Sequence, residues 1–260
     1  MSMASREQME AVSTLVYRKF GIYIGRDKFS RLAPKLERMT AREGYSGADE
    51  LYGRLASGDA ACLDRLVCYV TTCHTFFFRE PQHFSDLVSD IRKHGRHGIR
   101  IWCAACSTGE EPYSVAMTLL GGGISDFHIV ASDLNRDVLA EFNRGIYHGS
   151  RLAQTPPAVR QRYFTPLGDG YYRIDRGLRD FISIKNLNLM DPVHFPEPFD
   201  YVFCRNVFIY FNEESRAQAV GSITGNLRIG GTLFIGHAEV LLSPPDNLKK
   251  TGSSVYCRIY

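Results

Sequence analysis

Two adjacent carboxylates, Glu110 and Glu111, follow Gly109 directly in the stretch 99–114 (IRIWCAACSTGEEPYS). This stretch begins with apolar residues and continues with small residues up to Gly109. Two acids and a proline then mark the start of a helix. The pattern is typical of a strand, a ligand-holding turn and the start of a helix, so it predicts a nucleotide-type binding site. A phosphate suits this helix start poorly, because two carboxylates repel an anion while they stabilise the helix dipole.

A third acid, Asp133, ends the next apolar run, 127–132 (FHIVAS). Doubly wound sheets place an acid about twenty residues beyond the glycine turn, where it binds ribose hydroxyls. Only Gly109 lies in the turn and the chain has no G-x-G-x-x-G motif, so a dinucleotide fits poorly. A cationic or zwitterionic nucleoside such as S-adenosylmethionine fits better, with its positive charge beside Glu111. The alternative for Glu111 is a first-turn acid that only stabilises its helix.

Cys103 and Cys106 form a C-x-x-C pair, a spacing that suits redox or zinc chemistry. No second pair stands at finger spacing and Cys103 lies inside the predicted strand, so we expect neither function and no metal. Seven cysteines in 260 residues argue against a disulfide framework. Without a signal-peptide core or a long apolar run, we expect a soluble, cytoplasmic protein with no membrane insertion. A net charge of +3 is too small to indicate nucleic acid as a partner.

A sheet must bring these side chains together. Further strands are predicted over 182–189, 199–204 and 232–235, with a helix over 213–227, a turn at Gly230–Gly231 and a closing strand pair around 255–260. Polar residues stand at strand ends: Asn188 in the first, and Arg205 and Asn206 after the second. In open α/β sheets such positions share the carboxyl edge, where ligands bind. The pattern therefore predicts an α/β, doubly wound fold.

Two regions lie outside this pattern. The segment 146–179 predicts a small helix and a short antiparallel hairpin, which is either a partner-binding patch or a plain structural excursion. The connector 68–81 (CYVTTCHTFFFREP) carries Arg79 and hydroxyls, and is either an aromatic plug or a wall of the ligand site. Its hydroxyls belong to Thr71, Thr72 and Thr75.

The N-terminal segment is predicted to be helical over 6–21 and 26–42, with further helical pattern to Val67. In the second helix, an apolar stripe faces a core, and a basic stripe beside it faces out. The basic stripe consists of Lys28, Arg31, Lys35, Arg38 and Arg42. It is either a docking surface for an acidic partner or an ordinary solvated face. Pro34 either kinks this helix or begins it.

Five ordered stretches now resemble one family, the CheR family of chemotaxis receptor methyltransferases. They are 70–84 (VTTCHTFFFREPQHF), 101–117 (IWCAACSTGEEPYSVAM), 131–147 (ASDLNRDVLAEFNRGIY), 199–212 (FDYVFCRNVFIYFN) and 230–239 (GGTLFIGHAE). The resemblance implies a class I S-adenosylmethionine-dependent methyltransferase with a Rossmann-like sheet. It divides the chain into a helical domain with the basic docking helix (1–69), a linker contributing to the cofactor site (70–84) and a methyltransferase domain (85–260). A small antiparallel β-subdomain is inserted into the last at about 146–181.

The resemblance also implies site residues. Those implied for cofactor binding are Cys73, Thr75, Arg79, Glu111, Asp133, Asn188, Leu189, Arg205 and Asn206. Arg79 and Tyr210 are implied to lie at the point of methyl transfer. Cys73 stands where the family usually has an asparagine, and because a thiol donates only weakly, we expect weaker cofactor affinity.

The implied reaction transfers a methyl group from S-adenosylmethionine to glutamate carboxylates on chemoreceptor helices, with S-adenosylhomocysteine as product, for adaptation in chemosensory signalling. A carboxylate is already ionised near neutral pH, so the reaction needs no general base. The basic stripe then favours docking on acidic receptor helices. The short turn at 167–170 argues against tethering to a receptor's C-terminal pentapeptide, and we expect a monomer. The alternative is a non-catalytic sensor of the same fold that binds S-adenosylmethionine or S-adenosylhomocysteine.

Overall fold

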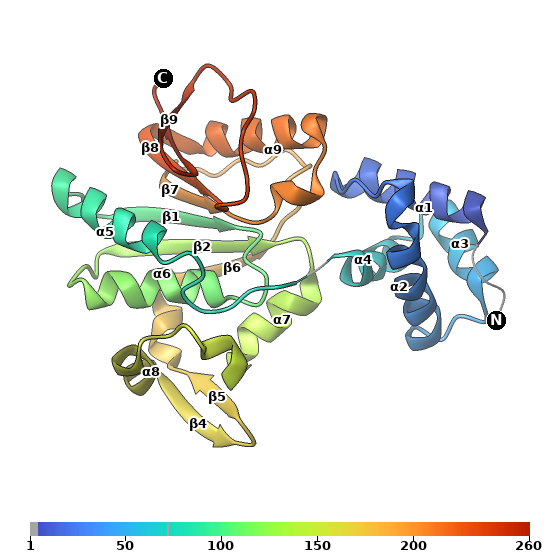
Figure 1. Ribbon diagram of the computed structural model, residues 1–260, viewed down its shortest axis with the longest axis horizontal. Coiled ribbons are helices and arrows are strands. Elements are labelled where there is room, and N and C mark those ends of the chain that lie inside the picture. Colours follow the sequence, from blue (N-terminus) through green and yellow to red (C-terminus); the bar gives the residue numbers. More distant parts are fainter. Residues whose placement is uncertain (1–4, 72) are drawn as a thin grey trace.

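Figure 1 shows the computed structural model, which describes residues 5–71 and 73–260. A group of N-terminal helices lies to one side of a central sheet, and a small second sheet lies below it. Thr72, one of the predicted connector hydroxyls, lies outside the described residues. Among the described residues no helix is long and apolar enough to cross a membrane.

The N-terminal helices are α1 (Arg6–Phe20), α2 (Phe29–Arg42), α3 (Ala48–Ala56) and α4 (Ala60–Val70). A capping box at Ser5 and Gln8 begins α1, and Gly21 ends it with φ 70°. Gly21 also packs closely on the methyltransferase domain, because an added Cβ would lie 2.4 Å from the sulfur of Met190. These helices bury their own apolar cluster, which includes Val16, Leu36 and Leu66.

The second helix begins later than the sequence predicts. Residues Arg26–Lys28 form a 3-10 turn, and α2 starts at Phe29. It continues through Pro34, so the prediction that the helix could begin at this proline is wrong. The apolar stripe is confirmed, since Leu32, Leu36 and Met39 are buried.

The central sheet has the strand order β6-β2-β1-β7-β8-β10-β9. Its strands are β1 (Ile99–Ala104), β2 (Phe127–Asp133), β6 (Ile182–Asn186), β7 (Phe199–Cys204), β8 (Leu227–Ile235), β9 (Leu248–Gly252) and β10 (Val255–Arg258). The first five are parallel to one another, and β10 is antiparallel to β8 and β9. The chain runs outward from β1 in one direction through β2 and β6, and returns to the other side at β7. The doubly wound prediction is therefore confirmed, with a topological switch point between β1 and β7.

Alternation along β1 buries both faces of the sheet. Ile101 and Cys103 join the core under α5 (Gln82–His94) and α6 (Glu110–Gly121). Trp102 and Ala104 join the opposite core under α9 (Glu213–Asn226). Helices on both faces explain why these strands are continuous apolar runs.

Two strand boundaries differ from the predictions. The strand predicted over 182–189 ends at Asn186, because its parallel partner β2 ends opposite it at Asp133. Gly230 and Gly231 lie within β8, where the pairing with β7 shifts register, and do not form a separate turn. A Cβ at Gly231 would lie 3.0 Å from the carbonyl oxygen of Asp200, so the bulge brings two backbones close together.

The predicted insertion contains β3 (Ile146–His148), α8 (Pro157–Tyr163), β4 (Phe164–Gly168) and β5 (Tyr171–Ile174). The helix and the hairpin are confirmed. β3 was not predicted, because three residues are too short to show a period, and it pairs with β5. Tyr147 and Ile174 belong to the same buried cluster as β1 and α6, so this subdomain packs on the main core.

Candidate active site

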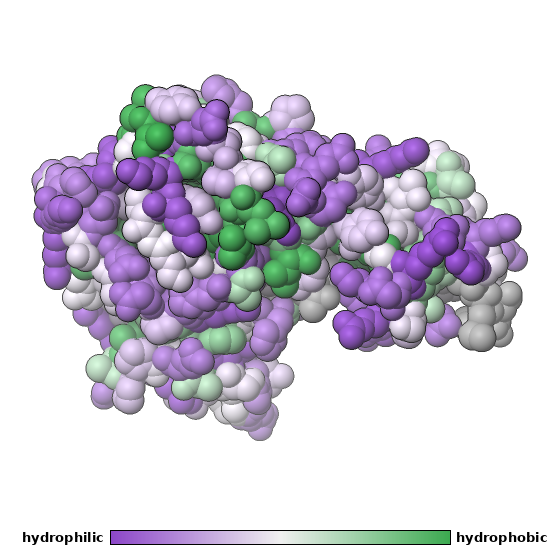
Figure 2. Space-filling view, turned by 45° about the horizontal axis from the view of Figure 1, so that its top comes forward, coloured by the Kyte–Doolittle hydropathy of each residue, from purple (hydrophilic) through white to green (hydrophobic). Residues whose placement is uncertain are grey.

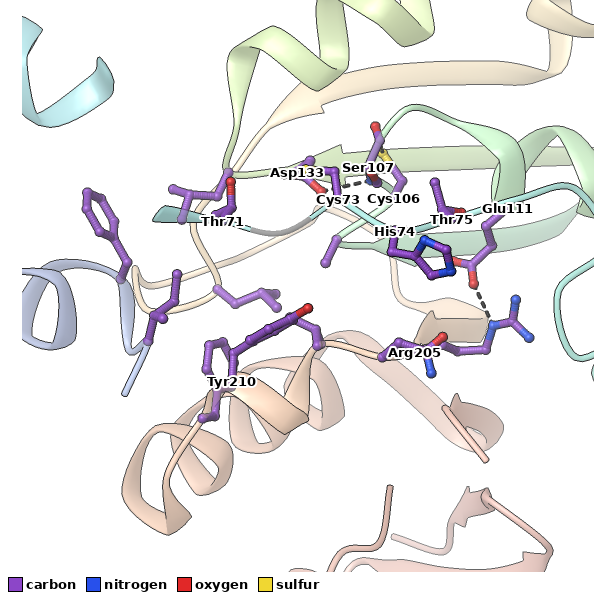
Figure 3. A pocket seen from close by; sticks show the side chains of 18 of the residues that line it. Thr71, Cys73, His74, Thr75, Cys106, Ser107, Glu111, Asp133, Arg205 and Tyr210 are labelled. Atoms are coloured by element: carbon purple, nitrogen blue, oxygen red, sulfur yellow. Dashed lines mark hydrogen bonds and ion pairs between the residues drawn. The ribbon is translucent and has the colours of Figure 1, made fainter. Parts of the chain in front are cut away.

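A pocket opens at the carboxyl edge of the sheet, beside the switch point. All ten residues predicted for the cofactor and the transfer point line it: Cys73, Thr75, Arg79, Glu111, Asp133, Asn188, Leu189, Arg205, Asn206 and Tyr210. Tyr210 lies across the pocket from Asp133 (Figure 3). Residues from distant parts of the sequence therefore meet at one cavity.

The turn after β1 holds Asp133 through the backbone. The carboxylate accepts hydrogen bonds from the amides of Ser107 at 2.8 Å and Asn135 at 2.9 Å. Burial raises the pKa of Asp133, and these amide donors act in the opposite direction. Gly109 has φ 93°, and an added Cβ would lie 2.2 Å from the ring of Phe142. The single glycine of the turn thus serves helix packing, which explains why the glycine pattern of a phosphate site is missing.

The two neighbouring acids face different surroundings. Glu110 is buried outside the pocket lining, where it accepts from the Thr108 hydroxyl at 2.7 Å and pairs with Arg151 at 3.3 Å. Glu111 lines the pocket and pairs with Arg205, at 2.6 Å between Oε2 and Nε. Burial raises the pKa of Glu111, and the guanidinium opposes this shift. Glu111 therefore faces the pocket with a charge that Arg205 already balances.

Arg205 joins the sheet edge to the connector. Its side chain is 2% exposed and donates to the carbonyl oxygen of Arg79 at 2.9 Å, with Glu80 at 3.4 Å. The side-chain amide of Asn206 donates to Glu80 at 3.2 Å, and its backbone amide donates to Glu239 at 2.8 Å. The sequence predictions missed Glu80 and Glu239, although both stand in the quoted family stretches. Glu80 directly follows Arg79 and Glu239 ends the stretch 230–239, and these positions were the available signals.

The connector is held by cationic side chains from three parts of the chain. Lys35 of α2 donates to the carbonyl oxygens of Val70 and Thr71, at 2.9 and 3.3 Å. Arg151, from the inserted subdomain, donates to the carbonyl oxygen of Thr75. Arg205 holds Arg79. Of the two interpretations of this segment, the structure favours a wall of the ligand site.

Lys35 thus differs from the other four cations of the predicted basic stripe. It is half-buried against the connector, and burial lowers its pKa. Its prediction as an outward-facing docking residue is wrong, because its ammonium group lies against the C-terminal end of α4. The other four, Lys28, Arg31, Arg38 and Arg42, are exposed.

The N-terminal helices close one side of the pocket. Phe20 and Ile22 line it, and neither was predicted. The side-chain amide of Asn188 donates to the carbonyl oxygen of Lys19 at 2.8 Å, so part of its hydrogen-bonding capacity serves this junction. The backbone amide of Tyr23 donates to the carbonyl oxygen of Tyr210 at 2.8 Å. The pocket is therefore built by both domains.

Arg79 lies at the pocket edge, half-buried. Its Nη1 donates to the carbonyl oxygen of His74 at 2.8 Å, and its guanidinium lies over the ring of Phe76. Its remaining nitrogens are geometrically separate donors, because the guanidinium presents five N–H groups in a planar fork.

Two residue groups could bind a metal by composition. Cys103 and Cys106 are buried, and burial raises their pKa values well above the usual range, which disfavours the thiolate that binds zinc. Among the described residues, Glu80, His83 and His237 place ligand atoms within 4.8 Å of one another. Arg205 Nη1 lies 3.3 Å from His83 Nδ1, so a guanidinium already provides positive charge there. Burial is the main cause that lowers the pKa of His83 to about 4.

The sheet order, the final antiparallel strand pair and the pocket at the switch point define a class I S-adenosylmethionine-dependent methyltransferase with an added helical domain and an inserted β-subdomain. Residues 73–257 match the family described as CheR methyltransferase, SAM binding domain. The chain belongs to this family, and the prediction made from the five sequence stretches is confirmed.

Named relatives cover most of the chain. It is 35% identical over 239 residues to a probable chemotaxis protein methyltransferase of Rhizobium etli, covering 86% of this chain and 89% of that protein. It is 34% identical over 254 residues to a chemotaxis protein methyltransferase of Salmonella typhimurium, covering 94% and 88%. A protein of Escherichia coli with the same name is 33% identical over 253 residues, with the same two coverages. The similarity therefore includes the N-terminal helices as well as the methyltransferase domain.

Proposed function

We propose that this methyltransferase esterifies glutamate side chains on chemoreceptors, as a protein-glutamate O-methyltransferase in chemosensory adaptation. The observation that carries the proposal is the similarity to proteins named chemotaxis protein methyltransferase over about nine-tenths of the chain. The pocket supports it, because Arg79 and Tyr210 line the same cavity as the residues predicted to hold the cofactor.

The pocket residues fit the cofactor that the family implies. Asp133 offers a carboxylate that its amide donors already orient, which suits ribose hydroxyls. Leu189 supplies an apolar surface and Asn188 a polar group on the side assigned to adenine. Cys73 and Thr75 contribute from the connector. When bound, S-adenosylmethionine supplies an electrophilic methyl group on a sulfonium.

The chain's task in the reaction is alignment. A glutamate carboxylate is ionised near neutral pH and can attack without a general base. Arg79 and Tyr210 orient this carboxylate, and holding two reactants in line removes much of the entropic barrier. One guanidinium nitrogen of Arg79 is already used by the His74 carbonyl, which limits the strength of a ground-state ion pair. This limit favours reaction, because charge is lost as the ester forms.

The exposed cations of α2 and of the 3-10 turn before it provide the docking surface in this proposal. Lys28, Arg31, Arg38 and Arg42 form a basic face that suits acidic receptor helices. We further propose that the enzyme acts in the cytoplasm as a monomer. We also propose that it is not tethered to a receptor's C-terminal pentapeptide, since the hairpin β4–β5 has a short turn.

The test uses labelled S-adenosylmethionine and membranes that contain chemoreceptors. The expected product is a base-labile methyl ester on receptor glutamate. Calorimetry with S-adenosylmethionine and S-adenosylhomocysteine accompanies the assay. Cofactor binding without any ester on a cognate receptor would favour the non-catalytic sensor.

Charge reversal tests the docking surface separately. Arg31→Glu with Arg38→Glu should weaken receptor methylation and leave the affinity for S-adenosylhomocysteine unchanged. Lys249→Glu with Lys250→Glu, on the exposed strand β9, is the matched control for net charge. Equal losses in both double variants would contradict a local docking role.

A further inference from the structure

Large apolar side chains are exposed on three segments that backbone hydrogen bonds join at Tyr210, Glu239 and Tyr23. Four of them form what we call the rim patch: Tyr23 at 54% exposed, Ile209 at 51%, Val240 at 51% and Leu242 at 74%. Figure 2 shows apolar side chains gathered in the middle of one face of the molecule, over the methyltransferase domain. Exposed apolar patches of this kind mark interaction surfaces more often than chance exposure does.

Backbone contacts connect the rim patch to the site. Ile209 directly precedes Tyr210, and its amide donates to the Glu239 carboxylate at 3.2 Å. The same carboxylate accepts from the amides of Asn206 and Gly236, so the segment that carries Val240 is attached to the turn that carries Tyr210. On the other side, the Tyr23 amide donates to the carbonyl oxygen of Tyr210. The patch therefore keeps a defined position relative to the transfer point.

The orientation of Val240 and Leu242 is also determined. Leu241 between them is 7% exposed, packs in the core of the α9 face, and its amide donates to the Tyr256 hydroxyl. Leu241 thus anchors the segment to the core, while Val240 and Leu242 on either side of it are exposed. Their exposure is thus built into the fold of this segment.

We infer that the rim patch binds apolar side chains of the substrate segment that flank the methyl-accepting glutamate. This inference rests on the proposed function and specifies its substrate. The occupant is an amphipathic, acidic polypeptide segment, with apolar residues beside the modified glutamate and further acids along its length.

Charge and position support this occupant. From Tyr23 the chain continues through the 3-10 turn Arg26–Lys28 into α2. The exposed cations begin at Lys28 in this turn, five residues beyond Tyr23, and continue along α2 from Arg31. Apolar contact next to the transfer point and positive charge farther along select a segment in which acids and apolar residues occur together. A single carboxylate in the pocket could not make this distinction, since every exposed glutamate presents the same group.

The test compares two changes of equal chemistry. Val240→Asp with Leu242→Asp should raise the KM for chemoreceptor membranes by about tenfold, because such contacts are lost and the new charges repel an acidic segment. The rate should recover at high receptor concentration, and the affinity for S-adenosylhomocysteine measured by calorimetry should stay unchanged. Ile229→Asp with Ile259→Asp is the control: these residues are 66% and 45% exposed, and they lie toward the amino end of β8 and just after the antiparallel strand β10, away from the pocket edge.

An unchanged KM in the double variant, with a wild-type enzyme that forms receptor ester, would overturn the inference and leave the proposed function standing. A wild-type enzyme that forms no ester overturns both. Sedimentation of the wild type and the double variant tests the competing occupant, since a dimer that the aspartates dissociate would show that the patch binds a second copy of the chain.

Discussion

The two walls of the cofactor pocket are held in different ways. At the sheet edge, the amide of Ser107 donates to the Asp133 side chain and the amide of Cys106 to the carbonyl oxygen of Ser132 at 2.9 Å. These contacts join neighbouring strands, so they form when the sheet forms. The described residues of the connector wall, on either side of position 72, pair with no strand, and side chains from distant elements hold their carbonyl oxygens.

The difference indicates that the connector wall can lose single contacts more easily than the sheet edge can. The connector depends on Lys35 from the helical domain, Arg151 from the inserted subdomain and Arg205 at the sheet edge. Each contact contributes on the scale of one hydrogen bond to a charged donor, about 1.5–3 kcal/mol at most. The sheet edge is part of the folded core, whereas the connector wall is the sum of a few separable contacts.

The largest effect is expected where the two walls meet. Arg205→Ala leaves Glu111 and Glu80 without their buried guanidinium, and we expect it to lower the free energy of unfolding by about 3–5 kcal/mol. Denaturant unfolding measures this loss. Arg205→Met combined with Glu111→Gln should recover part of it, because no buried charge at Glu111 is then left uncompensated. A loss of less than about 1 kcal/mol, the size expected of a surface pair, would show that the walls are not joined here.

The sheet edge is tested by Asp133→Asn. An amide side chain has only one acceptor oxygen, so the backbone amide of either Ser107 or Asn135 loses its acceptor. The negative charge is lost as well. We expect S-adenosylhomocysteine to bind roughly 10- to 100-fold more weakly, corresponding to about 1.5–3 kcal/mol. Calorimetry measures this change. Asp126→Asn is the control, since Asp126 accepts from the Gly98 amide at 2.7 Å near the amino end of the same strand. Equal affinities for wild type and Asp133→Asn would remove Asp133 from the ribose site.

The junction between the walls should also respond to acid through His83. Its pKa is about 4 in the folded protein, below the ordinary value of 6.5, so the unfolded chain binds the proton first. Stability is complete above about pH 6.5 and falls toward pH 4, by at most about 1.4 kcal/mol per pH unit. Unfolding at a series of pH values should give a shallower slope for His83→Gln than for wild type. The exposed His97, changed to Gln, is the control, and identical slopes for all three proteins would refute the buried neutral histidine.

The smallest effects are expected in the connector wall. Arg151→Met combined with Glu110→Gln removes the donor to Thr75 without leaving the buried Glu110 carboxylate unpaired. We expect cofactor affinity to fall about three- to tenfold, since one hydrogen bond to a charged donor contributes about 1.5–3 kcal/mol and only part of that loss reaches the cofactor. Lys35→Met should act similarly at Val70 and Thr71. Arg144→Met is the control, because this exposed cation pairs with Glu141 at 3.7 Å in its own helix. Affinity losses as large as that of Asp133→Asn would show that both walls are equally rigid.

The fold could be predicted from the sequence to the extent that it depends on local pattern. Apolar runs located the parallel strands, and the heptad-like spacing around Leu32 and Leu36 located a buried helix face. The predicted strand boundaries were wrong where pairing with a neighbouring strand decides them. The strand at 182–186 ends with its neighbour β2, and Gly230–Gly231 is a bulge because β7 and β8 pair on both sides of it.

In the candidate site, too, residues with a local pattern could be predicted and residues that depend on a distant partner could not. Asp133, Glu111 and Asn206 could be found because each stands next to a strand or helix end with a readable pattern. Arg151 and Lys35 could not, since a cation that binds a carbonyl oxygen 76 or 35 residues away leaves no local signal. The predicted five-cation stripe shows the limit directly. Helical period places Lys35 beside Arg31 and Arg38 and says nothing about the segment that packs against Lys35.

By itself, then, the sequence determined the chemistry at the sheet edge: an acid pair after Gly109, an acid after the second strand and the R-N step after 199–204. Local pattern is sufficient there, because parallel strands bring their carboxyl ends to one edge wherever they pair. Only the tertiary structure decided that Glu110 is buried against Thr108 and Arg151 while Glu111 faces the pocket and Arg205. Adjacent residues on a helix point in different directions, and their surroundings come from distant parts of the chain.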